Sequence, residues 1–483
     1  MSGVMAIVVA LGLLMYLAYR GVSLLILAPA LTALLALVSV DTPLLASYTQ
    51  VFMGAAGNFI VQFFPLFLLG AIFGKLMEDS GSAEVLARAI VQRLGDARGI
   101  LAVVLACAVM TYGGVSLFVV AFAIYPVAAA LFRENNIPKR LIPGTIALGA
   151  FTFTMTALPG TPAIQNAIPM PFFGTTPFAA PVLGIITAAI MFTLGILWLT
   201  RQYRQAMAVN EGYGDHADDP PKADRMMRER AEGEGFDISE LNEKCEPPHL
   251  PAFWVALLPI VLVIALNYLF SMIVIPAMDT TYLALPQYGE TDVGEVLGIW
   301  SIISALVISI IVISVLNRKR LSRFLETLDS GANASVLPIF NTASLVGFGA
   351  VIASLTAFEI IRSGVLDIGG VNPLVSLALS VNVLAGITGS ASGGMSIALQ
   401  TLGSNYVQMA ADAGISLELM HRVTTVATGG LDSLPHNGAI ITLLSICKLT
   451  HRESYKDIFI VAVLGPLISL IILIVLGTLV GSM

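Results

Sequence analysis

The sequence predicts an all-α polytopic membrane protein, and three observations lead to this fold class. Of the 483 residues, 57% are hydrophobic and only 11% are charged, whereas a soluble domain carries about 25% charged residues. The mean hydropathy is +0.88. Apolar runs long enough to cross about 30 Å of hydrocarbon recur along the whole chain. Each run must satisfy its own backbone hydrogen bonds in lipid, so we expect helices, and the alternating pattern of barrel strands is absent.

The basic residues select a topology, because Lys and Arg collect in cytoplasmic loops. They fall on one side if the apolar pairs 99–132 and 372–413 each enter and leave the same face of the membrane. This arrangement leaves only Arg362 and Arg422 of the 24 Lys and Arg residues outside, and it places none of them deep in a span. It predicts about ten spans and two re-entrant hairpins, with both termini outside.

Two halves of the chain resemble each other. Residues 1–200 and 251–483 are each expected to hold five spans and one hairpin, and the charged, Gly- and Pro-containing segment 201–250 is expected to be a cytoplasmic linker. Because five is odd, the second half is predicted to be inverted relative to the first. The halves share three short patterns in the same order, which are Phe64-Pro65-Leu66-Phe67 with Leu337-Pro338-Ile339-Phe340, Gly113-Gly114-Val115-Ser116 with Gly393-Gly394-Met395-Ser396, and Leu158-Pro159 with Leu434-Pro435.

Four segments at membrane depth are rich in Gly, Pro and hydroxyl residues and are predicted to interrupt helices. They are the two hairpin tips, 111–116 and 388–394, and breaks within the interrupted helices 141–170 and 419–447. Gly permits turn conformations and Pro removes a backbone donor. Freed backbone groups and helix N-termini can then bind an ion or an anionic group. The alternative is that small residues only allow close helix packing.

These interruptions supply the predicted substrate site, whose residues are Gly113, Gly114, Ser116, Thr161, Gln165, Asn166, Ser390, Ser392, Gly393, His436 and Asn437. Asp432 and His436 are the candidates for carrying a coupled proton, because ionisable residues inside a membrane are functional candidates by default. They are alternatively a structural pair that ties the broken helix together. The segment Glu78-Asp79-Ser80 is interpreted as a solvated helix exit, and His421 as the start of a helix on the outer side.

Other classes of function fit the sequence less well. Ser392 and His436 offer a nucleophile and a base, but the surrounding residues lack the pattern of an intramembrane hydrolase. There is no His-Glu-x-x-His motif, and three scattered cysteines form no metal pattern. We therefore expect no enzyme, no metal site, no organic cofactor and no nucleic-acid partner. A passive channel is the other alternative, and it would show no uphill accumulation.

Several motifs resemble the gluconate permease family of proton symporters. They are Phe73-Gly74-Lys75-Leu76-Met77-Glu78-Asp79-Ser80-Gly81, Gly389-Ser390-Ala391-Ser392 and Leu158-Pro159-Gly160-Thr161-Pro162-Ala163-Ile164. The gluconate members usually have a His in the first interruption, where this chain has Gly160 and Thr161. The stretch from Leu431 to Ala439 looks more like the 3-hydroxybutyrate permease branch.

The resemblance implies a secondary transporter that imports a small hydroxy-monocarboxylate, 3-hydroxybutyrate in the first place, together with a proton. Symport of gluconate or a related sugar acid, and sodium coupling, are the alternatives. It also implies a multi-pass protein of a bacterial cytoplasmic membrane, a homodimer in the lipid bilayer, and an elevator-type motion.

Overall fold

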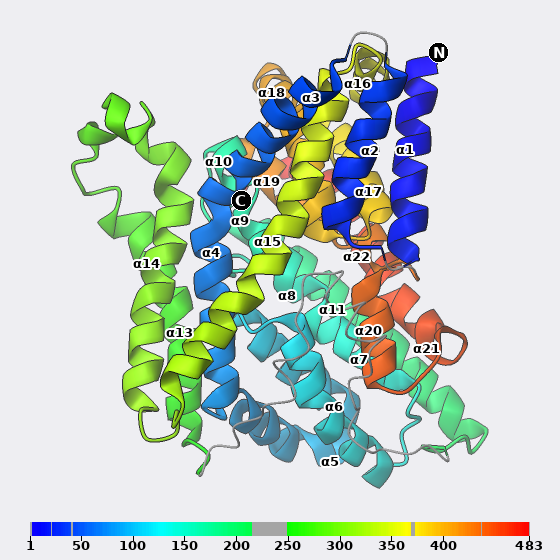
Figure 1. Cartoon of the computed structure of the whole chain (residues 1–483). Coiled ribbons are helices and arrows are strands. Elements are labelled where there is room, and N and C mark those ends of the chain that lie inside the picture. Colours follow the sequence, from blue (N-terminus) through cyan, green and yellow to red (C-terminus); the bar gives the residue numbers. More distant parts are fainter. Residues whose placement is uncertain are drawn as a thin grey trace.

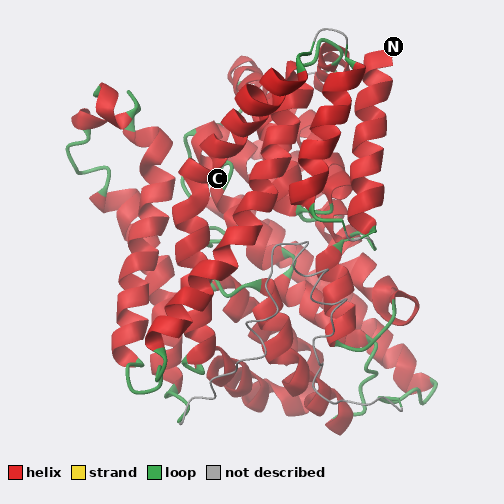
Figure 2. Ribbon diagram, viewed as in Figure 1, coloured by secondary structure: helices red, strands yellow, loops and turns green. Residues whose placement is uncertain are grey.

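The structure is a computed structural model that describes residues 2–20, 22–39, 42–214, 249–368, 372–435 and 437–482. Helices make up most of these residues, and no strand occurs among them (Figure 2). The predicted all-α fold class is confirmed. Most of the predicted linker 201–250 lies outside the described residues, because only 201–214, 249 and 250 are described.

The first half of the chain contains several long helices, one helix pair that forms a hairpin, and a segment in which a helix is broken into short pieces. Its elements are α1 (Ser2–Tyr19), α2 (Leu24–Val38), α3 (Leu44–Ala46), η1 (Ser47–Phe52), α4 (Met53–Asp79), α5 (Ser82–Tyr112), α6 (Leu117–Glu134), α7 (Leu141–Ala150), α8 (Phe153–Thr156), α9 (Ile164–Ala167), α10 (Met170–Phe173) and α11 (Pro181–Ala208). Helix α5 has non-helical backbone angles at Arg98, so its apolar part begins where the sequence placed the start of the first hairpin.

The second half begins with a helix that follows the linker. Its elements are α13 (Phe253–Leu269), η3 (Phe270–Val274), η4 (Thr281–Ala284), η5 (Pro286–Tyr288), α14 (Val293–Leu316), α15 (Phe324–Ser354), α16 (Phe358–Leu366), α17 (Pro373–Thr388), α18 (Ala391–Ala413), α19 (Leu417–Thr428), η6 (Leu431–Ser433), α20 (Gly438–Ile446), α21 (His451–Ile458), η7 (Phe459–Leu464) and α22 (Gly465–Val480).

Six helical segments among the described residues are long and apolar enough to cross a membrane. They are Leu44–Asp79, Pro181–Ala208, Phe253–Val274, Val293–Leu316, Phe324–Ser354 and His451–Val480. The chain is therefore a polytopic membrane protein. Helices α4 and α15 pack along each other through the middle of the molecule, with α13 and α14 on one side and the broken segments on the other (Figure 1). The count of about ten spans and the inverted repeat stay predictions.

Each of the four predicted interruptions contains a departure from α-helix among the described residues. The pair α5–α6 turns at residues 113–116, and the pair α17–α18 turns at Gly389 and Ser390. Residues 157–163 separate α8 from α9, and residues 429–437 separate α19 from α20, with a short 3-10 turn inside the second break. Gly and Pro residues occupy these positions because they allow or enforce the departure from helix.

The arms of the α17–α18 pair approach so closely that one position requires glycine. A Cβ atom at Gly394 would lie 2.2 Å from the backbone nitrogen of Ala385 on the opposite arm. Any side chain there would force the two arms apart, since packed interiors leave no space of this size. Gly394 therefore allows the two arms of the second hairpin to pack tightly. In the sequence, Gly393-Gly394 corresponds to Gly113-Gly114 of the first hairpin.

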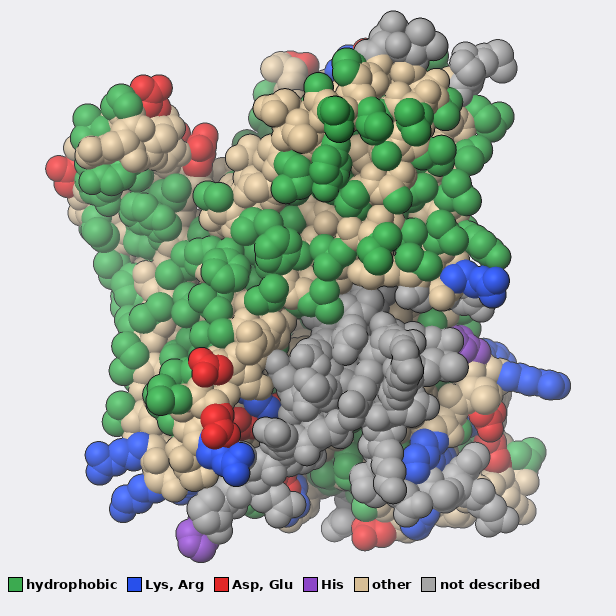
Figure 3. Space-filling view, in the orientation of Figure 1, with side chains coloured by type: hydrophobic (Ala, Val, Ile, Leu, Met, Phe, Trp, Pro, Cys, Tyr) green, Lys and Arg blue, Asp and Glu red, His purple; other side chains and the backbone are tan. Residues whose placement is uncertain are grey.

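Charged side chains gather at the two ends of the molecule. On the face seen in Figure 3, Lys and Arg lie mainly at the lower end, and acidic side chains mark the tip of the segment between α13 and α14 at the upper end. That segment contains Asp279, Glu290 and Asp292 and no basic residue. The distribution agrees with a basic cytoplasmic side, as the sequence analysis expects.

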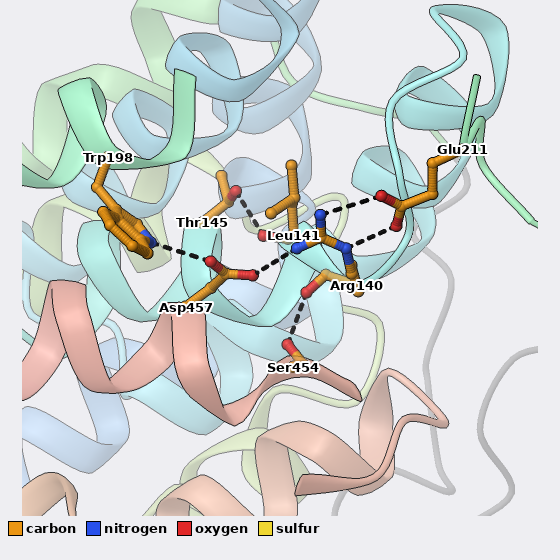
Figure 4. A network of polar contacts seen from close by, with 7 residues as sticks. All are labelled: Arg140, Leu141, Thr145, Trp198, Glu211, Ser454 and Asp457. Carbon is orange, nitrogen blue, oxygen red and sulfur yellow. Dashed lines mark hydrogen bonds and ion pairs between the residues drawn. The ribbon is translucent and has the colours of Figure 1, made fainter. Parts of the chain in front are cut away.

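A polar network at the lower end connects the two halves of the chain (Figure 4). Arg140, just before α7, forms two hydrogen bonds with Glu211, at 2.6 and 3.1 Å, and one with Asp457 of α21 at 3.0 Å. Trp198 of α11 donates to the other oxygen of Asp457 at 2.9 Å, and Ser454 donates to the carbonyl of Arg140 at 2.6 Å. The hydrogen bonds with Glu211 are the main cause that raises the pKa of Arg140 above its ordinary value. The network thus fixes α21 against the first half.

The orientation in the membrane can be tested by cysteine labelling. Cys107 and Cys447 are buried, so a Cys245→Ser background should react little with a membrane-impermeant thiol reagent. In that background, Tyr288→Cys in the outer segment should label in intact cells, because Tyr288 is 51% exposed. Met207→Cys at the end of α11, where Met207 is 58% exposed, should label only after the cells are opened. The reverse pattern would invert the predicted topology.

Candidate functional site

A cavity of about 310 Å³ lies where α4 and α15 meet the tips of both helix pairs and the first break. Predicted site residues from three separate interruptions form part of its wall. These are Gly114, Ser116, Gln165, Ser390 and Ser392. The structure therefore brings both hairpin tips and one interrupted helix together around a single space, although the sequence places them far apart.

Two helices begin at this cavity. Helix α6 starts after Ser116, whose side chain makes no capping hydrogen bond, and α18 starts after Ser390, whose hydroxyl accepts from the N–H of Gly393 at 3.2 Å. The first N–H groups of a helix lack partners within it, and they carry a partial positive charge. The positive ends of two helix dipoles thus lie at the cavity wall, which favours an anionic ligand.

Hydroxyl groups from three elements lie near each other at the cavity. The Oγ atom of Ser392 lies 3.5 Å from Oγ1 of Thr342 on α15 and 3.4 Å from Oγ of Ser390. Thr111 at the end of α5 also lines the cavity, and its buried hydroxyl has no hydrogen-bond partner among the described residues. A buried polar group normally has a partner, so this hydroxyl is available to a ligand.

The interpretation of residues 78–80 as a solvated helix exit is wrong. Lys75 and Glu78 line the cavity, with side chains only 7% and 17% exposed, and Ser80 is fully buried. The reason is that other elements cover the end of α4. Thr327 of α15 donates to Asp79 at 2.7 Å, and Ser80 forms a 2.7 Å hydrogen bond with Ser82 at the start of α5.

Three other predicted residues lie beside the cavity rather than in its wall. A Cβ atom at Gly113 would meet Ile260 of α13, and one at Gly393 would meet Leu345 of α15. Thr161 is fully buried inside the first break, where its hydroxyl accepts from the N–H of Ala163 at 3.3 Å. These positions shape the tips and the break, and they do not face the cavity.

The second break is fixed to the nearby hairpin tip by Asn437. Its Nδ2 donates to the carbonyls of Gly389 at 2.7 Å and Asp432 at 2.5 Å, and its Oδ1 accepts from the first N–H groups of α20. The carboxylate of Asp432 accepts from Ser433 at 3.1 Å. Neither Asn437 nor Asp432 lines the cavity. His436 lies outside the described residues.

The structure corrects the position of Arg422, which the topology placed outside the membrane on the outer side. Arg422 is fully buried, and its guanidinium donates to the carbonyl of Ala179 at 3.1 and 2.7 Å. It also donates to the carbonyl of Thr156 at 3.5 Å and to Oδ1 of Asn166 at 3.4 Å. Arg422 is therefore a buried cation and not a solvated loop residue, and its guanidinium satisfies carbonyls that lie before and after the first break.

Asn166 and His421 belong to the same buried cluster. Asn166 donates to the carbonyls of Thr161 at 3.1 Å and Pro177 at 3.0 Å, so its amide is engaged within the first break and does not line the cavity. His421 is fully buried between Thr175 at 2.6 Å and Asn166 at 3.3 Å. His421 lies in the first part of α19, as the sequence analysis expects, and its burial follows because α19 packs against the broken segment of the first half.

The comparison with known proteins identifies a family of transporters. No protein-family model matches the chain. A protein of Bacillus subtilis (strain 168), described as the uncharacterized transporter YxjC, is 45% identical over 459 residues, which cover 94% of both chains. The chain belongs to the YxjC family of transporters. An uncharacterized transporter of Haemophilus influenzae is 30% identical to it over 98 residues, which cover 20% of the chain and 23% of that relative.

Two solved structures share the fold of this YxjC-family member. The YdaH transporter of Alcanivorax borkumensis superposes with a TM-score of 0.55 and 16% identity, covering 94% of this chain and 96% of YdaH. MtrF of Neisseria gonorrhoeae, which is described with a class of antimetabolite efflux pumps, has a TM-score of 0.54 and 14% identity over 95% and 94% of the two chains. At these identities the likeness concerns the fold alone.

Arg422 is predicted to hold the first break together. Arg422→Met should lower the midpoint of thermal unfolding in detergent, because each buried acceptor left without a donor costs about 1–3 kcal/mol. Arg362→Met is the matched control, since Arg362 is 37% exposed and pairs with Glu359 on its own helix. Equal unfolding midpoints for the two variants would show that Arg422 does not stabilise the fold.

Proposed function

We propose that this transporter imports a small hydroxy-monocarboxylate together with a proton, and that the cavity between α4, α15 and the hairpin tips is its substrate site. The observation that carries the proposal is the meeting of two helix N-termini and Lys75 at one cavity. An anionic carboxylate is the ligand that such a set of N–H groups and one cation favours.

The cavity supports a small substrate of mixed polarity. Its volume of about 310 Å³ is at the lower end of the range of about 300–1,000 Å³ for small-molecule sites. Apolar side chains, including Leu66, Phe67 and Leu345, form part of the wall beside the hydroxyls. A short alkyl chain with one hydroxyl suits this wall better than a sugar acid, whose many hydroxyls would lose hydrogen bonds to water against apolar residues.

The sequence resemblance also favours a small hydroxy-monocarboxylate as the substrate. The motifs in residues 73–81 and 431–439 resemble the gluconate permease family, and the second of them the 3-hydroxybutyrate branch. Proton coupling is the property that this resemblance implies. One proton moving with one monoanion transfers no net charge, so the pH gradient alone would drive uptake, with about 1.4 kcal/mol for each pH unit.

Transport in liposomes tests the proposal. Purified protein should accumulate labelled 3-hydroxybutyrate under an inward proton gradient without sodium, and a protonophore should abolish the accumulation. Unlabelled gluconate, lactate and citrate would rank the substrates by competition. Uptake that requires sodium would indicate sodium coupling. Competition by gluconate alone would indicate a symporter of gluconate or a related sugar acid. Uptake that never exceeds equilibration would refute a coupled carrier and leave a passive channel.

A variant connects this activity to the cavity. Ser392→Ala removes a hydroxyl from the wall and should raise the half-saturating substrate concentration about tenfold, which corresponds to about 1.4 kcal/mol of lost binding. Ser363→Ala on α16 is the control, because Ser363 bonds only to carbonyls of its own helix and does not line the cavity. An equal effect of both substitutions would place the substrate elsewhere.

A further inference from the structure

Lys75 and Glu78 are the only ionisable side chains among the described residues that line the cavity. They lie one helical turn apart on α4, so both point toward the same side of the helix. The Nζ atom of Lys75 lies 3.5 Å from Oε2 of Glu78 and 3.1 Å from Oδ1 of Asp79. One cation is therefore placed between two carboxylates at the edge of the substrate space.

The two carboxylates have different surroundings. The second oxygen of Asp79 accepts a 2.7 Å hydrogen bond from Thr327 of α15, and Asp79 does not line the cavity. Glu78 does line it. Asp79 thus serves as a fixed partner of Lys75, whereas Glu78 shares its surroundings with any bound substrate.

Among the residues that the structure describes, no other charged side chain forms part of the cavity wall. Near this end of α15, Arg323 just before the helix pairs with Glu326 and both are exposed, and Asp329 is exposed as well. Glu84 and Arg88 of α5 also pair with each other and are more than a third exposed. Helix α14, which packs on α4, and helix α2, which packs on α15, contribute only apolar side chains to the cavity wall among the described residues.

Charge balance connects the binding of an anion to the binding of a proton. The cluster holds one positive and two negative charges when all three side chains are ionised. A substrate carboxylate would bring a third negative charge next to Glu78, whose side chain is only 17% exposed, and like charges at a mostly buried position oppose each other. A proton on Glu78 removes this repulsion and frees Lys75 to pair with the substrate. Each ligand therefore favours the binding of the other, as coupling requires.

We propose that Lys75 binds the substrate carboxylate and that Glu78 carries the coupled proton. This inference rests on the proposed function and assigns its proton to a residue other than Asp432 or His436. On binding, a proton from water adds to a Glu78 oxygen, and Lys75 moves its contact from Glu78 to the substrate. On release, the substrate anion leaves, Glu78 returns its proton to water, and Lys75 pairs with Glu78 again. Charge and atoms balance over the cycle.

The test compares Glu78→Gln with the wild type in the same liposomes. With a gradient of one pH unit, the wild type should accumulate substrate about tenfold at equilibrium. Glu78→Gln keeps the shape of the side chain and cannot bind or release a proton, so it should show no accumulation. It should still exchange labelled for unlabelled substrate across the membrane, which shows that it is folded and binds substrate.

A membrane potential gives a second readout that a purely structural defect would not produce. Wild-type uptake should not respond to a potential, because proton and anion cancel. Glu78→Gln would carry the anion alone, so a potential that is positive inside should drive its uptake. Glu84→Gln, outside the cavity, is the matched control and should behave as the wild type does. Lys75→Met should lose both exchange and accumulation, whereas Lys75→Arg should retain exchange.

The outcomes separate this inference from the proposed function. Proton-driven accumulation by Glu78→Gln at the wild-type level would overturn the role of Glu78, while the transporter remained a proton symporter. Exchange by Lys75→Met at the wild-type rate would overturn the role of Lys75. A wild type that accumulates substrate only with sodium, or not at all, would refute the proposed function and this inference together.

Discussion

The backbone groups that broken helices release inside an apolar protein have to find partners, and the rest of the structure depends on this constraint. At the first break, the carbonyls of Pro159 and Gly160 accept hydrogen bonds from Tyr112 and Asn267, and Arg422 donates to the carbonyls of Thr156 and Ala179 on either side of it. At the second, Asn437 bonds the break to a hairpin tip. These side chains come from distant parts of the chain, so the same bonds that satisfy the breaks also fix the hairpins around the cavity.

The cavity has two walls of different character. The continuous helices α4 and α15 form one wall, in which α4 supplies the ionisable pair of Lys75 and Glu78, while the hairpin tips supply helix N-termini, hydroxyls and small residues. A charged side chain on a continuous helix is attached to a fixed backbone position. The N–H groups at a helix N-terminus attract an anion through the partial positive charge of the helix dipole. A substrate between the walls would contact both kinds of group, which is the arrangement that alternating access needs at the interface of two bodies.

The sequence predicted the helices and breaks better than the side chains of the site. Gly and Pro have local effects on the backbone, so they marked both hairpin tips and both breaks. The topology treated Arg422 as a loop residue, because counting basic residues by membrane side assumes that each of them is solvated. Arg422 is buried instead, and the hydrogen-bond acceptors that make this possible come together only in the folded protein. Lys75 and Glu78 were missed for a similar reason, because a helix end looks solvated until the elements covering it are known. Asn166 was identified from the sequence as a polar residue of an interrupted helix. Its side chain contacts Arg422 and does not line the cavity, and only the fold shows this.

The burial of Arg422 also has a consequence for biogenesis. Helix α19 has only twelve residues and contains both His421 and Arg422, whereas a stable span needs about 20 apolar residues and an Arg at its centre costs about 2.5–3.5 kcal/mol to insert. The groups that accept the hydrogen bonds of this Arg belong to residues 156–179 of the first half. Helix α19 therefore gains a favourable environment only after the first half has entered the membrane and folded, so the order in which the ribosome delivers the two halves matches the order in which they can assemble.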